Sequence, residues 1–434
     1  MTDYIWKKAG QRGGPDAAVM DYLAGRDVML DRELIEFDIE ASQAHAEGLA
    51  QIGIISAEEA SQLVSALADI ARRLDSGSLS LDAPFEDGHS ALEAWLTEEL
   101  GSLGGKIHTG RSRNDQVAVA MRLYLRNRLK RLTAACIEIA EVLIRRAGKE
   151  GALPMPGHTH LQRAMPSSTG LWSAGHAEAF VDNAELARAT TQWLNASPLG
   201  TASGFGVNLP LPRAETAERL SFERIVVNPQ YAQNSRGKVE IQALSALAAA
   251  TRDLRRLAWD LSLYCSQEFG FVTLPDAWCT GSSLMPNKRN PDVVEVLRAQ
   301  HATVVAAQVE LESVMSLPSG YQRDLQATKA PVLRAFASSL QALELVPALL
   351  AAMQWNPNVM RDAITPEMLT TDRVTALSAE GIPFREAYRN VLQTEGGAED
   401  ESVEACLAKR CSPGASGALC LDVIAARIET LKAN

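Results

Sequence analysis

The spacing of apolar residues predicts a chain built mainly of long helices. Between residues 115 and 146 apolar side chains recur every three or four positions, as at Val117, Met121, Leu125 and Leu129. This is the period of one face of an α-helix. Comparable patterns predict four further long helices, at residues 167–194, 238–269, 291–317 and 324–353.

Several of these helices carry apolar residues on more than one face, as in the alanine-rich run at 244–250. A helix that is apolar all round is buried on all sides, so we expect these helices inside a bundle or an oligomer. Pro331 and Pro347 lie within the 324–353 pattern. Because proline removes a helical hydrogen bond, we expect this helix to bend or break.

The two ends of the chain have different patterns. Residues 1–30, with a turn-rich stretch at 10–15, are expected to be irregular. Ser56 and Glu59 have the spacing of a capping box, which predicts the start of a helix. Shorter helices are expected after Trp355. We therefore predict an all-α fold with three domains, at residues 1–105, 106–354 and 355–434.

Composition narrows the classes of function. The net charge of -11 and the pI near 5.3 argue against nucleic acid as a partner, since phosphate binding needs a basic surface. The six cysteines contain no Cys-x-x-Cys pair, which favours a reducing, cytoplasmic setting. The N-terminus lacks the apolar run of a signal peptide, and polar residues interrupt the most apolar helix candidate, so we expect no membrane partner.

The stretch 280–295 is the densest in chemically useful groups. Ser282 follows a glycine, and Asn290 and Pro291 suit the N-cap and first position of a helix. With Lys288 and Arg289 just before that helix, the stretch predicts an anion-binding pocket with hydroxyls beside it. The alternative is an exposed loop with basic residues, which composition alone favours.

A second polar loop precedes the helix at 115–146. Arg111 and Arg113 are suited to bidentate binding of carboxylates, and Ser112 and Asn114 to donating hydrogen bonds. The alternative is a loop in which Asn114 caps the helix and Arg111 pairs with Asp115.

Two histidines, His158 and His160, stand two residues apart in another polar loop, at 157–166. No cysteine or acidic residue lies at zinc-like spacing from them, so we expect no metal site. Thr159 lies between them. In such a loop a polar residue is more often structural than catalytic.

Two more polar segments are ambiguous on their own. Tyr321, Gln326 and Lys329 are typical of a helix start with a solvated lysine, and Asp87 and His89 of a solvated acidic turn.

Three strings carry a resemblance to known enzymes. Gly-Ser-Ser-Leu-Met-Pro-Asn-Lys-Arg-Asn-Pro at 281–291 and Thr-His-Leu-Gln at 159–162 resemble motifs of the fumarase/aspartase superfamily. Lys-Ile-His-Thr-Gly-Arg-Ser-Arg-Asn-Asp-Gln at 106–116 closely resembles the argininosuccinate lyases. The resemblance covers about residues 31–329, with the motifs in the family's order. It implies long helices of four subunits packed into a twenty-helix core, with each active site assembled from three chains of a homotetramer.

The resemblance also implies a reaction, the reversible anti β-elimination of argininosuccinate to arginine and fumarate in arginine biosynthesis, without a cofactor or metal. It makes Ser282 the base and His160, oriented by Glu295, the acid or proton relay, with Lys288 stabilising charge. The implied substrate-binding residues are Arg111, Ser112, Arg113, Asn114, Thr159, Asn290, Tyr321, Gln326, Lys329, Asp27, Asp87 and His89.

Two alternatives stay open. One is another fumarate-releasing lyase acting on a different succinyl amine, against which the Arg-Ser-Arg-Asn-Asp string argues. The other is a catalytically silent structural protein, since the same family includes lens delta-crystallins. The presence of Ser282, His160, Lys288 and Glu295 favours catalysis. Asp27 stands where the family often has a serine, which leaves open what binds the arginine end.

Overall fold

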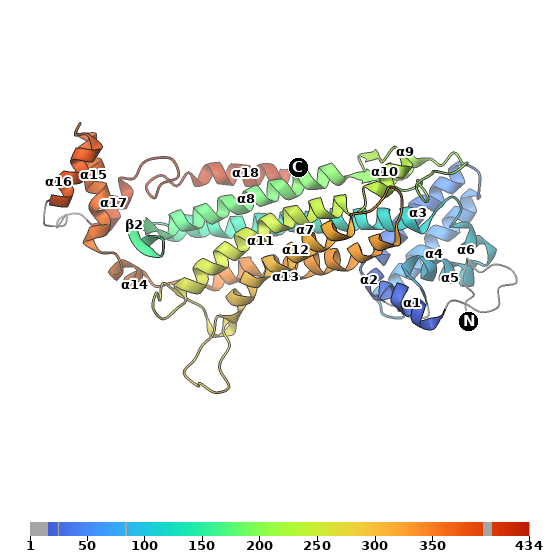
Figure 1. Ribbon diagram of the computed structural model, residues 1–434, viewed down its shortest axis with the longest axis horizontal. Coiled ribbons are helices and arrows are strands. Elements are labelled where there is room, and N and C mark those ends of the chain that lie inside the picture. Colours follow the sequence, from blue (N-terminus) through green and yellow to red (C-terminus); the bar gives the residue numbers. More distant parts are fainter. Residues whose placement is uncertain (1–15, 25, 83–84, 394–401, 434) are drawn as a thin grey trace. The chain divides into compact units, whose positions relative to one another are not determined.

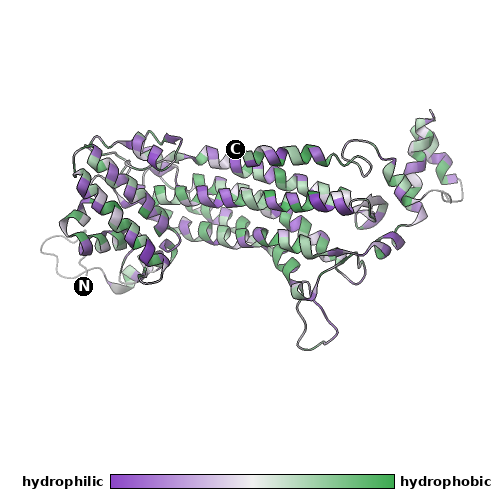
Figure 2. Ribbon diagram, turned by 180° about the vertical axis from the view of Figure 1, so that it is seen from behind, coloured by the Kyte–Doolittle hydropathy of each residue, from purple (hydrophilic) through white to green (hydrophobic). Residues whose placement is uncertain are grey.

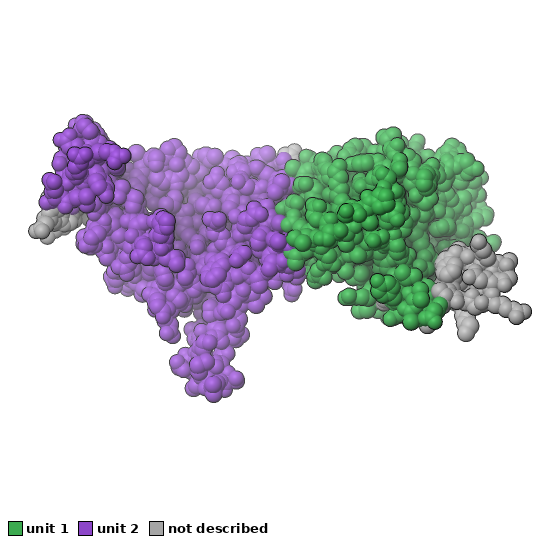
Figure 3. Space-filling model, in the orientation of Figure 1, with its two compact units in different colours: residues 1–130, 189–245, 306–337 green, residues 131–188, 246–305, 338–434 purple. Residues whose placement is uncertain are grey.

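The computed structural model describes residues 16–24, 26–82, 85–393 and 402–433. The turn-rich stretch at 10–15 lies outside the described residues. Two compact units divide the chain, and both are discontinuous in sequence (Figure 3). Unit 1 contains residues 1–130, 189–245 and 306–337. Unit 2 contains residues 131–188, 246–305 and 338–434. The expected three-domain division stays a prediction.

Five long helices confirm the all-α prediction (Figure 1), and each contributes residues to both units. They are α7 (Arg113–Glu150), α8 (Thr169–Leu194), α11 (Lys238–Tyr264), α12 (Asp292–Val314) and α13 (Lys329–Ala352). Apolar and polar positions recur along them as a helical period requires (Figure 2). Residues 323–352 are long and apolar enough to cross a membrane by length and composition, but more than half of the most apolar window is buried.

The α13 helix corrects the prediction made from its prolines. It starts at Lys329 because residues 323–328 form the 3₁₀ turn η2, and Pro331 therefore lies in the first helical turn. A proline is tolerated there, since the backbone N–H groups of a first turn have no helical partner. The helix also continues through Pro347. The expected break is absent from this described helix, and the expected bend stays a prediction.

The N-terminal part of unit 1 contains more helix than expected. Residues 1–30 were expected to be irregular, but α1 (Ala17–Ala24) and α2 (Asp27–Asp31) form there. Both helices are too short for periodicity to reveal. The next helices are α3 (Ile35–Gln51), α4 (Ala57–Asp75), α5 (Gly88–Leu100) and α6 (Ser102–Lys106). Leu49, Leu63, Leu67 and Ile70, all fully buried, pack between them.

A β-hairpin in unit 2 occupies the segment expected to be a loop around residues 157–166. Strands β1 (Pro154–Thr159) and β2 (Gln162–Ser168) pair antiparallel, with a register shift between Pro156 and His158. Prolines and glycine within the strands hide the alternating pattern that would have indicated them.

The other elements are short. Two-residue strands β3 (Ala196–Ser197) and β4 (Arg224–Ile225) pair parallel in unit 1, and β5 (Val272–Thr273) and β6 (Gln354–Trp355) pair antiparallel in unit 2. The remaining helices are α9 (Arg213–Arg219), α10 (Pro229–Asn234), η1 (Asp276–Trp278), α14 (Pro357–Asp362), η3 (Pro366–Leu369), α15 (Thr370–Ala379), α16 (Phe384–Gln393), α17 (Val403–Ala408) and α18 (Leu421–Ala433).

The predicted capping box at the start of α4 is confirmed. The Ser56 hydroxyl accepts from the Glu59 N–H at 3.1 Å, and the Glu59 carboxylate accepts from the Ser56 N–H at 2.8 Å. Replacing Ser56 by alanine should lower the free energy of unfolding by about 1 kcal/mol, because one N–H of the first turn loses its partner. Urea unfolding of Ser56→Ala and of a control, Ser61→Ala in the exposed middle of α4, would measure this. Equal stability of the two variants would contradict it.

Candidate active site

The loop at 281–289 is closed at its neck by backbone pairing in unit 2. The Thr280 N–H donates to the Asn290 carbonyl at 3.0 Å, and the Asn290 N–H to the Thr280 carbonyl at 2.8 Å. The Thr280 hydroxyl also donates to the Asp292 carboxylate. Because both limbs are fixed at one point, the residues between them form a discrete loop that projects from the long helices (Figure 1).

Asn290 contributes to this neck rather than capping α12. Its amide donates to the Gly281 carbonyl at 3.3 Å. A capping side chain would instead accept from an N–H of the first turn, and no such bond from Asn290 is found in the described chain. The helix begins at Asp292, one residue later than expected.

The Ser282 hydroxyl is held inside the loop by two backbone amides. Its oxygen accepts from the Met285 N–H at 3.0 Å and from the Leu284 N–H at 3.3 Å. Ser282 is half-buried, whereas Leu284 is 84% exposed and Lys288 is exposed as well. Donors directed at a hydroxyl oxygen favour its deprotonated form. The loop therefore suits Ser282 to act as a base.

Arg289 anchors the second limb of the loop. Its guanidinium lies 2.6 Å from the Asp276 carboxylate and donates to the Leu274 carbonyl at 3.0 Å. These contacts occupy the guanidinium, so Arg289 does not contribute to an open anion pocket. Lys288 is the remaining cation of the loop.

The tip of the β1–β2 hairpin carries Thr159 and His160, both exposed. Thr159 pairs with Gln162, and the two residues between them, His160 and Leu161, have φ angles of 56° and 58°. Positive φ at both central residues is the geometry of a type I′ turn, which normally selects Asn or Gly. Bulky residues are uncommon in this region of backbone space, and such outliers concentrate at functional sites.

Residues near the C-terminus fix the base of this hairpin. Arg410 donates to both carboxylate oxygens of Asp372, at 3.1 and 2.7 Å, and to the Pro166 carbonyl in β2. The Ser168 hydroxyl donates to that of Ser416 at 3.3 Å. An isolated two-stranded hairpin is marginally stable, so these contacts give the strained turn a fixed support.

Glu295 does not contact His160 in the described chain. It lies one turn into α12, and its carboxylate is 3.8 Å from the Arg298 guanidinium. The hypothesis that Glu295 orients His160 therefore stays a prediction. It requires that the two residues meet across a contact between subunits.

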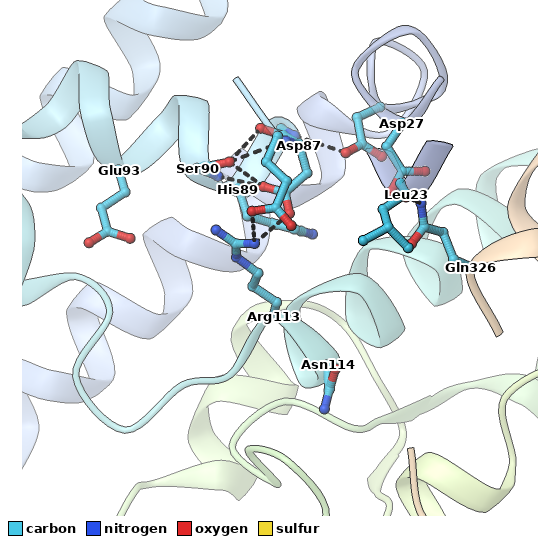
Figure 4. Close-up of polar contacts among 12 residues, drawn as sticks. Leu23, Asp27, Asp87, His89, Ser90, Glu93, Arg113, Asn114 and Gln326 are labelled. Carbon is cyan, nitrogen blue, oxygen red and sulfur yellow. Dashed lines mark hydrogen bonds and ion pairs between the residues drawn. The ribbon is translucent and has the colours of Figure 1, made fainter. Parts of the chain in front are cut away.

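Unit 1 contains a buried ion network around Lys329. Figure 4 shows its member Asp27 together with Asp87 and Arg113. The Lys329 ammonium lies 2.6 Å from Asp31 and 3.5 Å from Asp27. Burial opposes the charge on the lysine, but the two carboxylates more than offset this and raise the pKa of Lys329. Burial raises the pKa of Asp27 in spite of the lysine. Lys329 is thus fully engaged within the fold.

Arg113 and Asp87 form the next part of the network. The Arg113 guanidinium lies 2.8 Å from Glu86 and 3.4 Å from Asp87. Asp87 also caps α5 by accepting from the Ser90 N–H at 2.8 Å. Burial works against ionisation, yet His89 and Arg113 lower the pKa of Asp87. Asp87 therefore stays charged.

The other residues of the 111–115 loop differ in their availability. The buried Arg111 guanidinium donates to the Ser42 hydroxyl at 2.8 Å, and Ser112 starts α7 by accepting from the Asn114 N–H at 3.3 Å. Asp115 accepts from the Ser112 N–H at 2.9 Å rather than pairing with Arg111. The Asn114 side chain points away from the ion network (Figure 4) and has no hydrogen-bond partner within the described residues. It remains available to a ligand.

His89 is buried behind this network. Its Nδ1 lies 2.6 Å from Asp38 Oδ2, while Asp38 Oδ1 is buried without a hydrogen-bond partner within the described residues. Burial lowers the basicity of His89, but Asp38, Asp87 and Asp31 outweigh it and raise the pKa of His89. The positive charge of His89 therefore stabilises the nearby carboxylates of Asp87 and Asp31.

In η2, Gln326 donates to the Leu23 carbonyl at 2.6 Å. Tyr321, two residues before η2, lies beneath Arg236, whose guanidinium carbon is 5.6 Å from the ring centroid. The sequence predicted neither Arg236 nor the acidic partners Asp31 and Asp38. One signal was available for the two aspartates, because they stand seven residues apart at buried helical positions where apolar residues are expected.

The raised pKa of His89 predicts a pH dependence of stability. A basic group whose pKa is higher in the folded state stabilises the fold fully below its unfolded value, 6.5, and loses this contribution as the pH rises through the folded value. The difference in Tm between wild type and His89→Gln should therefore shrink as the pH rises above 6.5. Thermal unfolding at a series of pH values would measure it, and a constant difference would contradict the ion pair.

Comparison with known proteins extends over the whole chain. A family model described as Lyase matches residues 17–306. The argininosuccinate lyase of Xanthomonas axonopodis pv. citri is 53% identical over 434 residues, covering 100% of both chains. That of Xylella fastidiosa is 51% identical over 432 residues, covering 99% of this chain and 97% of its own.

Solved structures agree on the fold. EDDS lyase in complex with formate superposes with a TM-score of 0.78 at 23% identity, covering 97% of this chain and 92% of its own. A class II fumarase from Schistosoma mansoni has a TM-score of 0.67 at 18% identity, covering 83% and 88%. The full-length identity of 53% shows that the chain belongs to the argininosuccinate lyase family.

Proposed function

We propose that the protein cleaves argininosuccinate to arginine and fumarate by anti β-elimination, without a metal or cofactor. The observation that carries this is the Ser282 hydroxyl, which accepts from two backbone amides inside a loop closed at its neck. Full-length identity of 53% to proteins named argininosuccinate lyase supports this substrate over another succinyl amine. The same identity makes a catalytically silent structural protein the less favoured alternative.

In the first step, Ser282 removes the proton from the carbon next to a succinyl carboxylate, and the electron pair moves onto that carboxylate. Serine is a weak base, and each pKa unit by which its alkoxide is stabilised corresponds to about 1.4 kcal/mol. The Leu284 and Met285 amides supply part of this stabilisation. Lys288 and the start of α12 offer positive charge to the doubly negative carboxylate that forms.

In the second step, the carbon–nitrogen bond breaks and the departing guanidino nitrogen takes up a proton. His160 is our candidate for the acid or for a proton relay, since it stands next to Thr159 at the tip of a hairpin whose base is anchored. That proton restores the guanidinium of the leaving group, so fumarate and arginine are the two products. Thr159 is placed to bind the succinyl end.

The other substrate-binding residues come from unit 1. Asn114 has a side-chain amide that no described group occupies, so we assign it a direct contact. Lys329, Arg113, Asp27, Asp87 and His89 instead form an internal network, and their contribution is a fixed field around the bound molecule.

We further infer a homotetramer whose active sites combine residues of different chains, in the cytoplasm. Apolar side chains that are exposed on the long helices support association: Trp259 is 46%, Val296 59% and Val309 61% exposed. The exposure of the 281–289 loop and of the hairpin tip supports contacts with other subunits. The cytoplasmic setting rests on cysteine usage alone.

Replacing Ser282 by alanine should lower kcat by several orders of magnitude, since removal of the reacting base affects only the transition state. KM for argininosuccinate should change little. Fumarate absorbance would follow the reaction, with Ser283→Ala as the matched control in the same loop. Near-normal turnover by Ser282→Ala would exclude it as the base.

A mixture of two low-activity variants tests the shared site. Subunits with Ser282→Ala and subunits with Asn114→Leu should, when co-expressed and purified as hybrids, regain activity above that of either parent. Some sites would then combine the intact Ser282 of an Asn114→Leu subunit with the intact Asn114 of a Ser282→Ala subunit. Hybrids no more active than the mean of the parents would indicate that each site lies within one chain.

A further inference from the structure

His158 stands beside Thr159 and His160 in the hairpin, but it has no part in the proposed chemistry. Its ring centroid lies 5.4 Å from that of Phe269 and 6.5 Å from that of Phe271. The two phenylalanine rings pack edge-to-face at 5.2 Å, and Phe271 is buried. All of these residues belong to unit 2. An aromatic contact therefore docks the hairpin on the segment that leads from α11 into β5.

An irregularity in the hairpin fixes where the His158 ring points. The pairing of β1 with β2 shifts register between Pro156 and His158. A Cβ at Gly157 would lie 2.7 Å from the Met165 carbonyl oxygen, so a larger residue would push the strands apart. The His158 ring hydrogen-bonds to the Pro156 carbonyl across this irregularity. Bulges of this kind re-aim a side chain and are frequent next to active sites.

The His158 ring is neutral at neutral pH. Burial and the nearby Arg163 lower its pKa from the ordinary value of 6.5, against the hydrogen bond to Pro156. A neutral ring packs on aromatic side chains without the cost of removing a charge from water. His158 is therefore suited to packing rather than to acid catalysis.

This stack is the support nearest to the tip of the hairpin in the described chain. Residues 159–163 beyond it are all exposed. The next anchor, Arg410, contacts Pro166 near the base. A strand advances about 3.3 Å per residue, so His158 lies within about 7 Å of His160 along the chain. Loss of the stack would allow the exposed tip to tilt about the base.

The segment that carries the two phenylalanines also anchors the loop at 281–289. The Asn356 N–H donates to the Phe271 carbonyl at 2.9 Å, which holds this segment in place. The Leu274 carbonyl, three residues after Phe271, accepts from Arg289 at 3.0 Å. One segment thus supports both candidate catalytic elements of the chain.

We propose that His158 is a positioning residue of the reaction. Its stack on Phe269 and Phe271 sets the angle at which the hairpin presents Thr159 and His160 to the substrate. The inference rests on the proposed function, because it needs a reaction in which this tip takes part. A displacement of about 1 Å can slow a reaction by about a hundredfold, so a contact this close to the tip affects turnover.

Replacing His158 by alanine should lower kcat for argininosuccinate about ten- to a hundredfold, because the tip no longer meets the transition state correctly. KM should rise by less than about threefold, since other groups also hold the substrate. His158→Phe restores a ring without a titratable nitrogen and should keep kcat within about threefold of wild type. Fumarate absorbance gives the rates, expressed per folded enzyme from circular dichroism. Phe384→Ala, which removes an exposed ring from α16, is the control.

A double-mutant cycle tests whether the stack itself carries the effect. Phe269→Leu removes the partner ring and should lower kcat to a similar extent. In the double variant His158→Ala/Phe269→Leu the two losses should not add, because both substitutions remove one contact. Should His158→Ala fail to fold, His158→Leu takes its place in the cycle, since leucine fills the site without supplying a ring.

The outcomes separate this inference from the proposed function. If wild type releases no fumarate from argininosuccinate, the proposed function fails and the inference falls with it. If wild type is active and His158→Phe is as slow as His158→Ala, the imidazole rather than the stack is required, and the inference is overturned. Additive losses in the double variant, or a wild-type kcat in His158→Ala, would overturn it as well.

Discussion

The buried ion pair of Lys329 with Asp31 and Asp27 is the interaction on which the substrate-binding half of this protein depends. Charges of this kind are expensive to remove from water, and truncating one partner leaves a buried unpaired charge that destabilises a protein by about 3–5 kcal/mol. Asp31 also accepts from the Gly88 N–H at 2.8 Å, which joins α2 to the start of α5. Lys329 and Asp31 together thus link the start of α13 to α2 and to the start of α5.

Because of this network, several predicted substrate-binding residues pair with other residues of the fold. Asp27, Asp87, His89, Arg113 and Lys329 were all predicted to bind substrate, and all of them contact one another or a further buried acid. A network that is already satisfied holds its geometry when a ligand arrives, which favours preorganised binding. The Asn114 side chain, which has no hydrogen-bond partner among the described residues, then has hydrogen-bonding capacity to offer.

In unit 2, by contrast, the candidate catalytic groups lie on exposed segments rather than in a buried network. The Ser282 loop is fixed at its neck by Thr280, Asn290 and Arg289, and the hairpin is fixed at its base by Arg410. The anchoring contacts hold the neck of the loop and the base of the hairpin. The tips can therefore move while their starting points stay in place, as closure over a substrate requires.

Periodicity predicted the long helices and the Ser56 capping box, because these features depend on residues close together in sequence. It missed α1, α2 and the hairpin, whose formation depends on tertiary contacts such as that of Arg410 with Pro166. The motifs predicted which segments carry polar chemistry. They could not predict that Asn290 donates to Gly281, or that Lys329 is paired internally, since each of these choices is made by partners elsewhere in the fold.

The central claim is that the chain acts as a lyase on argininosuccinate. The most direct measurement is fumarate release by the purified wild-type protein from argininosuccinate, compared with adenylosuccinate and other succinyl amines under the same conditions. We expect a kcat/KM for argininosuccinate that exceeds that for every other compound by orders of magnitude. Comparable or faster release from a different succinyl amine, or no release from any of them, would contradict it.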